Sequence, residues 1–264
     1  DQTICATSAT ATMAATAANG TIAWSVVPGQ GTGTFVDGTM EDAVYNITAA
    51  DKAAGHVTLR MTVDNATCDA VSDDVVITID PAVVAGTASV ENAAICNGGT
   101  TTLHLATYTG TIKWQSSPDN SVWTDVAGAT GATLNTGALT ATTYYRATVT
   151  SGVCGSDYSN VVTVTVYPTS VAGTVSGVNS ICTGSGTTLT LAGSVGTIQW
   201  QHSPDGTNWN NYIGANNAAL ITPALNSTTY FRATVTSGVC SVANTVAYEV
   251  TVSPATVAGN ATAA

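Results

Sequence analysis

Apolar residues alternate with threonine along much of the chain, at the period of two that is typical of a β-strand with one buried face. The alternation is clearest over 57–63 and 162–166. No segment sustains the spacing of an amphipathic helix, and interleaved threonines argue against a helix in the Ala-rich stretch 9–18. Short strands separated by Gly, Asn and Pro-Asp turns predict an all-β protein made of small antiparallel sandwiches.

Internal repetition divides this pattern into three units. Cys68, Cys154 and Cys240 follow one another at intervals of 86 residues, and units two and three are close copies of each other. A Val-Ala-Gly tripeptide shortly after a proline ends each unit. We therefore expect three tandem immunoglobulin-like antiparallel β-sandwiches with one disulfide each. The predicted segments are a first sandwich over 1–81, a second over 82–168, a third over 169–254, and a linker with the start of a further repeat over 255–264.

The repeat is out of phase with the ends of the sequence. Gly86 lies ten positions before Cys96 and Gly173 lies nine before Cys182, but only four residues precede Cys5. We expect a segment of a longer array, in which the first unit lacks its first strand.

Six cysteines occur at two per unit. An even number at this density in small β-domains predicts a disulfide within each unit and an oxidising, secreted context. Zinc motifs need Cys or His pairs two to four residues apart, and the sequence has none. The expected pairs are Cys5 with Cys68, Cys96 with Cys154, and Cys182 with Cys240.

A tryptophan recurs between the cysteines of each unit, within a Thr-Ile-x-Trp motif at Trp24, Trp114 and Trp200. On a strand with one buried face, this residue shares its side with the preceding isoleucine. We expect each of these tryptophans in a core, where it buries on the order of 200 Å².

The charge balance limits the possible partners. Only 8% of residues are charged and the net charge is −11, whereas nucleic-acid binding requires a cationic face, so nucleic acid is not expected as a partner. No apolar run approaches the roughly 18 residues that a membrane span needs, so direct membrane insertion is not expected either.

Acidic residues cluster in the first unit. Carboxylates on loops between strands could bind Ca²⁺, but their spacing matches no defined calcium loop, and a solvated acidic surface is the simpler interpretation. Apart from this calcium hypothesis we expect no cofactor. The residues concerned are Asp37, Glu41, Asp42, Asp64, Asp69, Asp73 and Asp74.

Trp123 and Trp209 lie nine residues after the core tryptophans of units two and three. An exposed tryptophan there could stack on a sugar ring, which would make a glycan-binding module; alternatively, each packs against its own domain. The nucleophile elbow, the zinc-protease motif, the phosphate loop and the dinucleotide fingerprint are all missing from the sequence, so we do not expect an enzyme.

Units two and three share Trp-Gln-x-Ser-Pro-Asp, Thr-Thr-Tyr-[Tyr/Phe]-Arg and a terminal Ser-Gly-Val-Cys. In these motifs they resemble the immunoglobulin-like repeats of giant cell-surface proteins of Bacteroidetes. Unit one, with Gly31–Phe35 and Gly55–Leu59, resembles the PKD-like repeat found beside them. Because the second cysteine follows the end of its strand, the disulfide is expected to staple a pole of the sandwich.

The resemblance implies a long secreted adhesin of the SprB-like gliding-motility type, exported by the type IX system to the bacterial cell surface. We expect a stalk or spacer segment, whose partners are further repeats of the same polypeptide. Two alternatives stay open. One is binding to surface glycans, and the other is a filament of copies, in which the tail Val257–Ala264 completes the strand that the next chain's first unit lacks.

Overall fold

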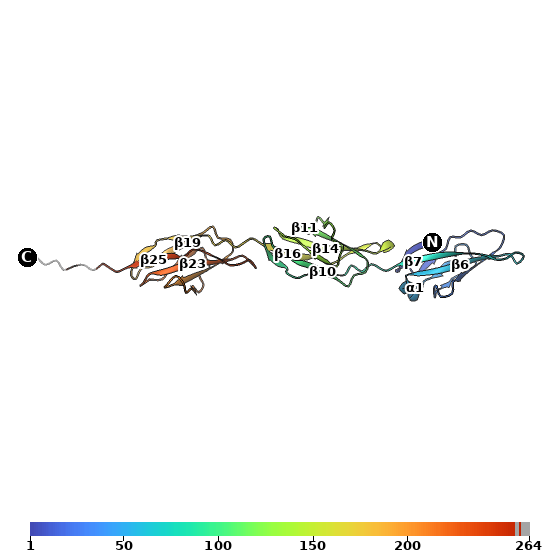
Figure 1. Cartoon of the computed structure of the whole chain (residues 1–264), viewed down its shortest axis with the longest axis horizontal. Helices are drawn as coiled ribbons and strands as arrows, with labels where there is room; N and C mark the ends of the chain where they lie inside the picture. Colours follow the sequence, from blue (N-terminus) through green and yellow to red (C-terminus); the bar gives the residue numbers. More distant parts are fainter. Residues whose placement is uncertain (257–258, 260–264) are drawn as a thin grey trace, which may run out of the picture. The chain divides into compact units, whose positions relative to one another are not determined.

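The computed structural model describes residues 1–256 and 259, and its regular secondary structure consists almost entirely of β-strands (Figure 1). The residues divide into two compact units, and the strands of the second repeat are distributed between them. The predicted start of a further repeat falls largely outside the described residues. Unit 1 comprises Asp1–Glu91, Thr102–Asn135 and Tyr144–Thr163, and unit 2 comprises Asn92–Thr101, Thr136–Thr143 and Val164–Ala264.

The first repeat, in unit 1, has two sheets. Its four-stranded sheet has the order β1-β7-β6-β3, and its three-stranded sheet has the order β2-β5-β4. β6 and β7 form a long antiparallel hairpin, and β1 pairs with β7 in parallel. The strands are β1 (Gln2–Cys5), β2 (Thr10–Thr12), β3 (Thr21–Val26), β4 (Thr34–Phe35), β5 (Val44–Asn46), β6 (His56–Asp64) and β7 (Val71–Asp80).

Alternation along these strands builds the core. Val57 and Leu59 of β6 and Ile77 of β7 are fully buried and pack with Tyr45 and Ala11 of the facing sheet. The one α-helix among the residues that the structure describes, α1 (Ala49–Ala54), lies between β5 and β6 in the chain. A capping box of Thr48 and Asp51 starts this helix, and Gly55 in the left-handed conformation ends it.

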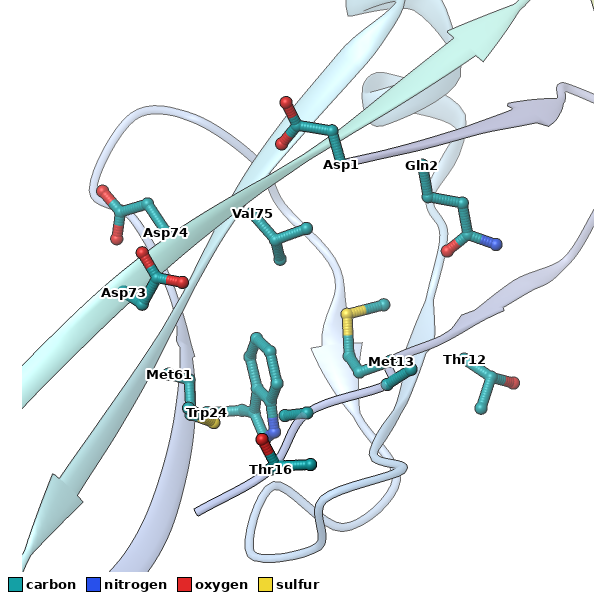
Figure 2. A pocket seen from close by; sticks show the side chains of 12 residues that line it. Asp1, Gln2, Thr12, Met13, Thr16, Trp24, Met61, Asp73, Asp74 and Val75 are labelled. Atoms are coloured by element: carbon teal, nitrogen blue, oxygen red, sulfur yellow. The ribbon is translucent and has the colours of Figure 1, made fainter.

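The sandwich of the first repeat is open along one seam. A pocket of about 590 Å³ lies between the sheets and is lined by the apolar side chains of Met13, Trp24, Met61 and Val75 together with the carboxylates of Asp1, Asp73 and Asp74 (Figure 2). Trp24 is therefore only partly buried.

The rest of unit 1 comes from the second repeat. One sheet has the order β13-β10-β8; in the other, β14 pairs with β11 and β15, and β11 pairs with β12. The elements are β8 (Thr87–Val90), β10 (Thr102–Ala106), β11 (Thr111–Ser117), β12 (Thr124–Asp125), β13 (Thr133–Asn135), β14 (Thr143–Thr150), the 3₁₀ turn η1 (Gly152–Cys154) and β15 (Ser156–Tyr158).

Unit 2 begins with β9 (Ala94–Cys96), which pairs in parallel with β16 (Val162–Tyr167). The third repeat follows as a complete two-sheet sandwich, with a three-stranded sheet β17-β19-β22 and a second sheet β18-β25-β23-β20-β21 to which β24 adds. Its strands are β17 (Thr174–Gly177), β18 (Ser180–Cys182), β19 (Thr188–Ala192), β20 (Thr197–Ser203), β21 (Asn210–Asn211), β22 (Ala219–Ile221), β23 (Thr229–Thr236), β24 (Ala243–Asn244) and β25 (Tyr248–Ser253).

The core of the third repeat joins both of its sheets. Trp200 and Phe231 from the larger sheet pack with Leu189, Leu191 and Leu220 from the smaller one. These positions alternate with exposed or half-buried residues, as a pleated strand with one buried face requires.

Candidate functional site: the junctions between repeats

Disulfides join consecutive repeats. Cys5 is bonded to Cys154 across a sequence separation of 149 residues, and Cys96 is bonded to Cys240 across 144. The Cα atoms lie 4.9 and 5.0 Å apart, within the normal range. The predicted pairing within each repeat is therefore wrong: the first cysteine of one repeat bonds to the second cysteine of the next.

The strand register explains this correction. Cys5 pairs with Asp80 at the end of the ten-residue strand β7, whereas Cys68 lies in the turn that precedes β7. Ten residues at ~3.3 Å each separate the two cysteines by roughly 30 Å. A disulfide between them is impossible without unfolding the hairpin.

The third repeat has the same arrangement. Cys182 pairs with Ser253 at the end of β25, and β23 runs antiparallel to β25, so Cys240 beyond Thr236 lies at the opposite pole. The expectation that both cysteines lie at one pole is wrong for the same reason. In each case the first cysteine lies where the chain leaves its repeat and enters the next one.

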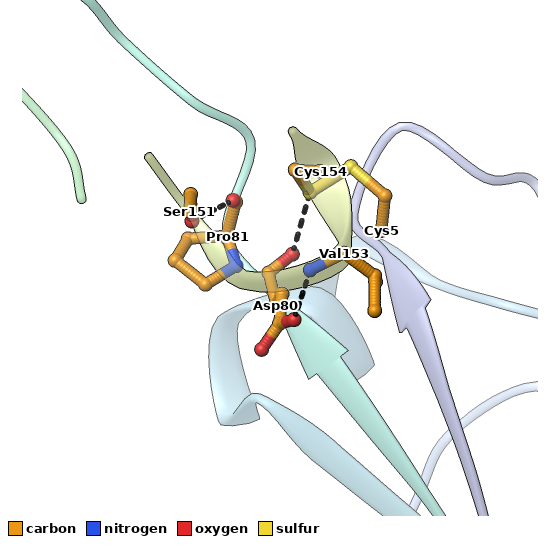
Figure 3. Close-up of a disulfide and its surroundings, with 6 residues drawn as sticks. All are labelled: Cys5, Asp80, Pro81, Ser151, Val153 and Cys154. Carbon is orange, nitrogen blue, oxygen red and sulfur yellow. Dashed lines mark hydrogen bonds between the residues drawn. A yellow bond between two sulfur atoms is a disulfide. The ribbon is translucent and has the colours of Figure 1, made fainter. Parts of the chain in front are cut away.

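The first junction is built on the exit from β7 (Figure 3). Val153 donates its backbone N–H to the Asp80 carboxylate at 2.8 Å, and Ser151 Oγ donates to the carbonyl oxygen of Pro81 at 2.6 Å. The Sγ of Cys154 lies 3.4 Å from the carbonyl oxygen of Asp80. The Ser-Gly-Val-Cys motif thus contacts the end of the preceding repeat through Ser151, Val153 and Cys154.

The second junction repeats this design with other side chains. The backbone N–H of Ser237 donates to Ser170 Oγ at 2.9 Å, and the Sγ of Cys240 lies 3.3 Å from the carbonyl oxygen of Pro168. Ser170 and Ser237 are both buried. The Ser-Gly-Val-Cys copies at 151–154 and 237–240 are therefore docking turns, a role that the sequence analysis did not assign to them.

The glycine of each docking turn has two reasons to be glycine. Gly152 and Gly238 have φ angles of +42° and +52°, which favour glycine. A Cβ on Gly152 would also collide with the carboxylate of Asp80, and one on Gly238 would collide with the ring of Tyr167. Asp80 and Tyr167 are the residues opposite Cys5 and Cys96. Each docking turn thus lies directly against the strand partner of the cysteine that it binds.

Two cysteines in the described part of the chain remain free: Cys68 and Cys182, and both are exposed. Each belongs to a position that forms a junction elsewhere in the chain. Cys68 corresponds to Cys154 and Cys240, and Cys182 corresponds to Cys5 and Cys96.

The repeated tryptophans occupy two kinds of environment. Trp114 and Trp200 are completely buried. The indole N–H of Trp114 donates to the carbonyl oxygen of Gly131, and that of Trp200 donates to the carbonyl oxygen of Asn217, both at 2.9 Å. Trp24 lines the open seam and donates to Met40 at 3.1 Å.

Trp123 and Trp209 each carry an arginine on the ring. The guanidinium of Arg146 lies 4.3 Å from the centroid of Trp123, and that of Arg232 lies at the same distance from Trp209. Both arginines also donate to the glutamine of the Trp-Gln motif. These contacts favour packing of each tryptophan on its own domain, and binding of glycans through these rings stays a prediction.

The acidic residues of the first repeat are spread over several local contacts. Among the described residues, no group of three or more His, Cys, Asp or Glu side chains is arranged to hold a metal ion. Asp74 makes a two-pronged ion pair with Arg60, Asp37 accepts from the backbone of Thr39, and Asp64 accepts from the backbone of Ala66.

Asp51 is the buried exception among the acids. Burial opposes its ionisation, but hydrogen bonds from the backbone N–H groups of Thr48 and Thr32 and from the hydroxyl of Tyr45 outweigh that cost and lower its pKa. Burial and the adjacent carboxylate raise the pKa of Tyr45 to about 12. This network fixes the start of α1 to β5.

The first and third repeats, each a two-sheet sandwich, place the chain among all-β proteins of tandem immunoglobulin-like repeats. Residues 84–168 and 171–254 match the family model described as Domain of unknown function (DUF8696). The matches cover more than half of the chain, so the chain belongs to this family.

The comparison with solved structures found an adhesin and an ectodomain of immunoglobulin-like domains, among others. A Ca²⁺-stabilised adhesin that helps an Antarctic bacterium bind ice is 14% identical with a TM-score of 0.36, covering 98% of this chain and 73% of that one. The mouse nectin-like molecule 4 ectodomain is 12% identical with a TM-score of 0.46, covering 98% and 100%. Among curated proteins, none matches this chain. No helix among the described residues is long and apolar enough to span a membrane.

Proposed function

We propose that this chain is a non-enzymatic spacer segment of a long secreted adhesin on a bacterial cell surface, and that its role is mechanical reach. The observation that carries the proposal is the pair of disulfides that join consecutive repeats. Disulfides of this kind persist in oxidising, extracellular environments. The narrower proposal, that the adhesin is of the SprB-like gliding-motility type, rests on the sequence resemblance alone.

The disulfides limit how far the chain can be stretched. The shortest covalent path starts at residue 1, crosses from Cys5 to Cys154, runs back to Cys96, crosses to Cys240 and continues to residue 264. It contains about 89 residues, or roughly 320 Å when fully extended, compared with roughly 950 Å for the reduced chain at ~3.6 Å per residue. A pulled segment would therefore unfold but stay covalently connected, and its length would not exceed roughly 320 Å.

Single-molecule force spectroscopy tests the spacer proposal. The oxidised chain should reach about a third of the extended length of the chain treated with dithiothreitol. Cys154→Ser should lengthen the oxidised path by roughly 110 Å, whereas Cys68→Ser should leave it unchanged. Equal extended lengths with and without reductant would refute the proposal.

We also infer a second candidate function, a filament subunit assembled by strand complementation, from the free edge of β2. Met13 donates its N–H to the carbonyl of Ala43, and Ile47 donates to Ala9, so the odd-numbered residues of β2 bond to β5. Thr10 and Thr12 therefore point their backbone groups toward the other edge, which bears no strand among the described residues. The equivalent strands β10 and β19 are paired at both edges.

The proposed occupant of this edge is the tail of a second copy. Its sequence Val257-Ala258-Gly259-Asn260-Ala261-Thr262 resembles 84–89, which leads into β8. Deleting 257–264 should abolish filaments seen by electron microscopy, and Ala261→Pro should do the same because proline removes a backbone donor. Unchanged filaments in both variants would exclude strand complementation.

A further inference from the structure

An arginine lies on the outward side of the same strand in the second and the third repeat, but its contacts differ. The guanidinium carbon of Arg146 lies 4.3 Å from the ring centroid of Trp123 and 3.9 Å from that of Tyr158. Arg232 has the first of these rings, Trp209, at 4.3 Å, and among the described residues no second ring lies on it. The guanidinium of Arg232 therefore lacks a ring on the plane that Tyr158 covers in the second repeat.

The difference comes from a single side chain on an unchanged backbone. Tyr158 of β15 pairs with Thr148, and Asn244 of β24 pairs with Thr234 in the equivalent register. In both repeats the hydroxyl of the following residue accepts a hydrogen bond from the backbone of β14 or β23, at 2.9 and 3.0 Å. Asn244 is exposed and has no ring to place on the arginine. We call the plane that it leaves bare the uncovered plane of Arg232.

The charges beside the arginine differ in the same way. In the second repeat Lys113 forms an ion pair with Asp125 at 3.0 Å, and the third repeat has Gln199 and Asn211 at these two positions. Gln201 accepts from Nε of the third repeat's arginine at 2.7 Å and donates to Asn211 at 2.8 Å. The neighbours are thus neutral amides, and among the described residues no carboxylate forms an ion pair with this arginine.

We propose that the third repeat binds an aromatic side chain of a partner protein, such as a tyrosine, on the uncovered plane of Arg232. The electron-rich face of an aromatic ring complements a guanidinium whose charge no acid neutralises. The second repeat shows that a tyrosine ring fits this position, because Tyr158 occupies it there.

The composition of the site favours a protein partner. Arginine and tryptophan are enriched among the residues that dominate protein–protein binding, and polar side chains typically surround them. Arg232 and Trp209 form such a centre, with the amides of Asn211 and Asn244 near it. This binding role goes beyond the spacer function, and all of its residues belong to one repeat and lie outside the docking turns.

The test titrates the purified 264-residue chain, with both disulfides intact, with N-acetyltyrosinamide. The arginine Nε–H signals are followed by ¹H–¹⁵N NMR, and the signal of Arg232 is assigned by its loss in Arg232→Lys. This signal should shift, because a stacked ring shields it, and the signal of Arg146 should stay in place. N-acetylleucinamide, which has no ring, should shift neither. An equal response of both arginines, or no response of Arg232, would overturn the proposal.

Exchanging the two residues between the repeats provides matched variants. Asn244→Tyr should place the chain's own ring on Arg232 and weaken binding by about tenfold, whereas Asn244→Ala should bind like the parent chain. Tyr158→Asn should make Arg146 respond to N-acetyltyrosinamide as Arg232 does. Each exchange installs the residue that the other repeat already has at this position, so both variants should fold. Unchanged binding in Asn244→Tyr would mean that the uncovered plane is not the site.

A neutral saccharide is the competing ligand, because amide side chains also hydrogen-bond to hydroxyl groups. Maltose should leave the Arg232 signal unshifted under the same conditions. A shift with maltose and none with N-acetyltyrosinamide would overturn the proposal in favour of a glycan site. Force spectroscopy measures the spacer function independently of this titration, so either proposal can fail alone.

Discussion

Cys5 and Cys68 belong to the same repeat but lie at opposite ends of β7, one beside its last residue and the other before its first. The pair that counting cysteines per repeat suggests therefore cannot form. Cys5 instead holds the docking turn of the next repeat, and Cys96 does the same one repeat later. Because the loops 5–154 and 96–240 overlap, the disulfides connect all three repeats into one covalent framework.

The first prediction concerns the stability that these bonds provide. Cys5→Ser and Cys154→Ser should lower the melting temperature by the same amount, and the double variant should lower it no further, because both remove one bond. In the chain-entropy model a loop of about 150 residues contributes about 5 kcal/mol. Differential scanning calorimetry measures the shift, with Cys68→Ser as the control that changes nothing. If Cys68→Ser lowered the melting temperature as much as Cys5→Ser does, the result would favour a disulfide within the repeat instead.

The second prediction isolates the collision at the docking turn. Gly152→Ala should open the first junction, whereas Gly128→Ala should leave it closed. Both glycines have positive φ, at +42° and +72°, but a Cβ on Gly128 meets nothing within 4 Å. Each variant carries a backbone cost of about 1 kcal/mol, and only Gly152→Ala adds the clash with Asp80. Hydrogen exchange of the Val153 amide, which bonds to Asp80, reports the opening of this junction. Equal exchange rates in the two variants would contradict the docking role of Gly152.

Much of the fold could be predicted from local patterns. Alternation over 57–63 and 162–166 predicted strands, and β6 and β16 lie there. The burial of Trp114 and Trp200 agrees with the face that the pleat assigns to them. The disulfide pairing could not be predicted this way, because it depends on where β1 pairs along β7, and register between distant strands is not visible in sequence spacing.

The docking role of Ser-Gly-Val-Cys was also beyond local reasoning. Its repetition at 151–154 and 237–240 was visible, but its contacts lie about 70 residues away, with Asp80 and Pro168. The sequence signal that could have found it is the glycine two positions before the cysteine in both copies. A glycine repeated at such a position indicates a positive φ or a close approach of another segment. The helix α1 was missed because its six residues are too few for a helical period to be recognised.

The third prediction compares the repeated tryptophans. Trp200→Ala should cost about 3 to 5 kcal/mol of stability, because the side chain is completely buried among both sheets of its sandwich. Trp24→Ala should cost less, because Trp24 lines an open pocket and already contacts solvent. Chemical denaturation followed by circular dichroism measures both. Equal costs would mean that the seam beside Trp24 is closed in solution.

The fourth prediction concerns acid sensitivity of the first repeat through Asp51. Its pKa is lowered in the folded state, since the hydrogen bonds from Thr48, Thr32 and Tyr45 outweigh the cost of burial. A carboxylate with a lowered folded pKa stabilises the protein above its unfolded pKa of about 4, and this contribution is lost as the pH falls through the folded value. Asp51→Asn lacks the charge at every pH, so it should be less stable than the parent chain at pH 7, and the difference should shrink as the pH drops below about 4. Thermal melts across this range measure the difference, with the exposed Asp69→Asn as the matched control that stays close to the parent throughout. If the deficit of Asp51→Asn were as large at low pH as at pH 7, the ionised carboxylate would not be what holds α1 against β5.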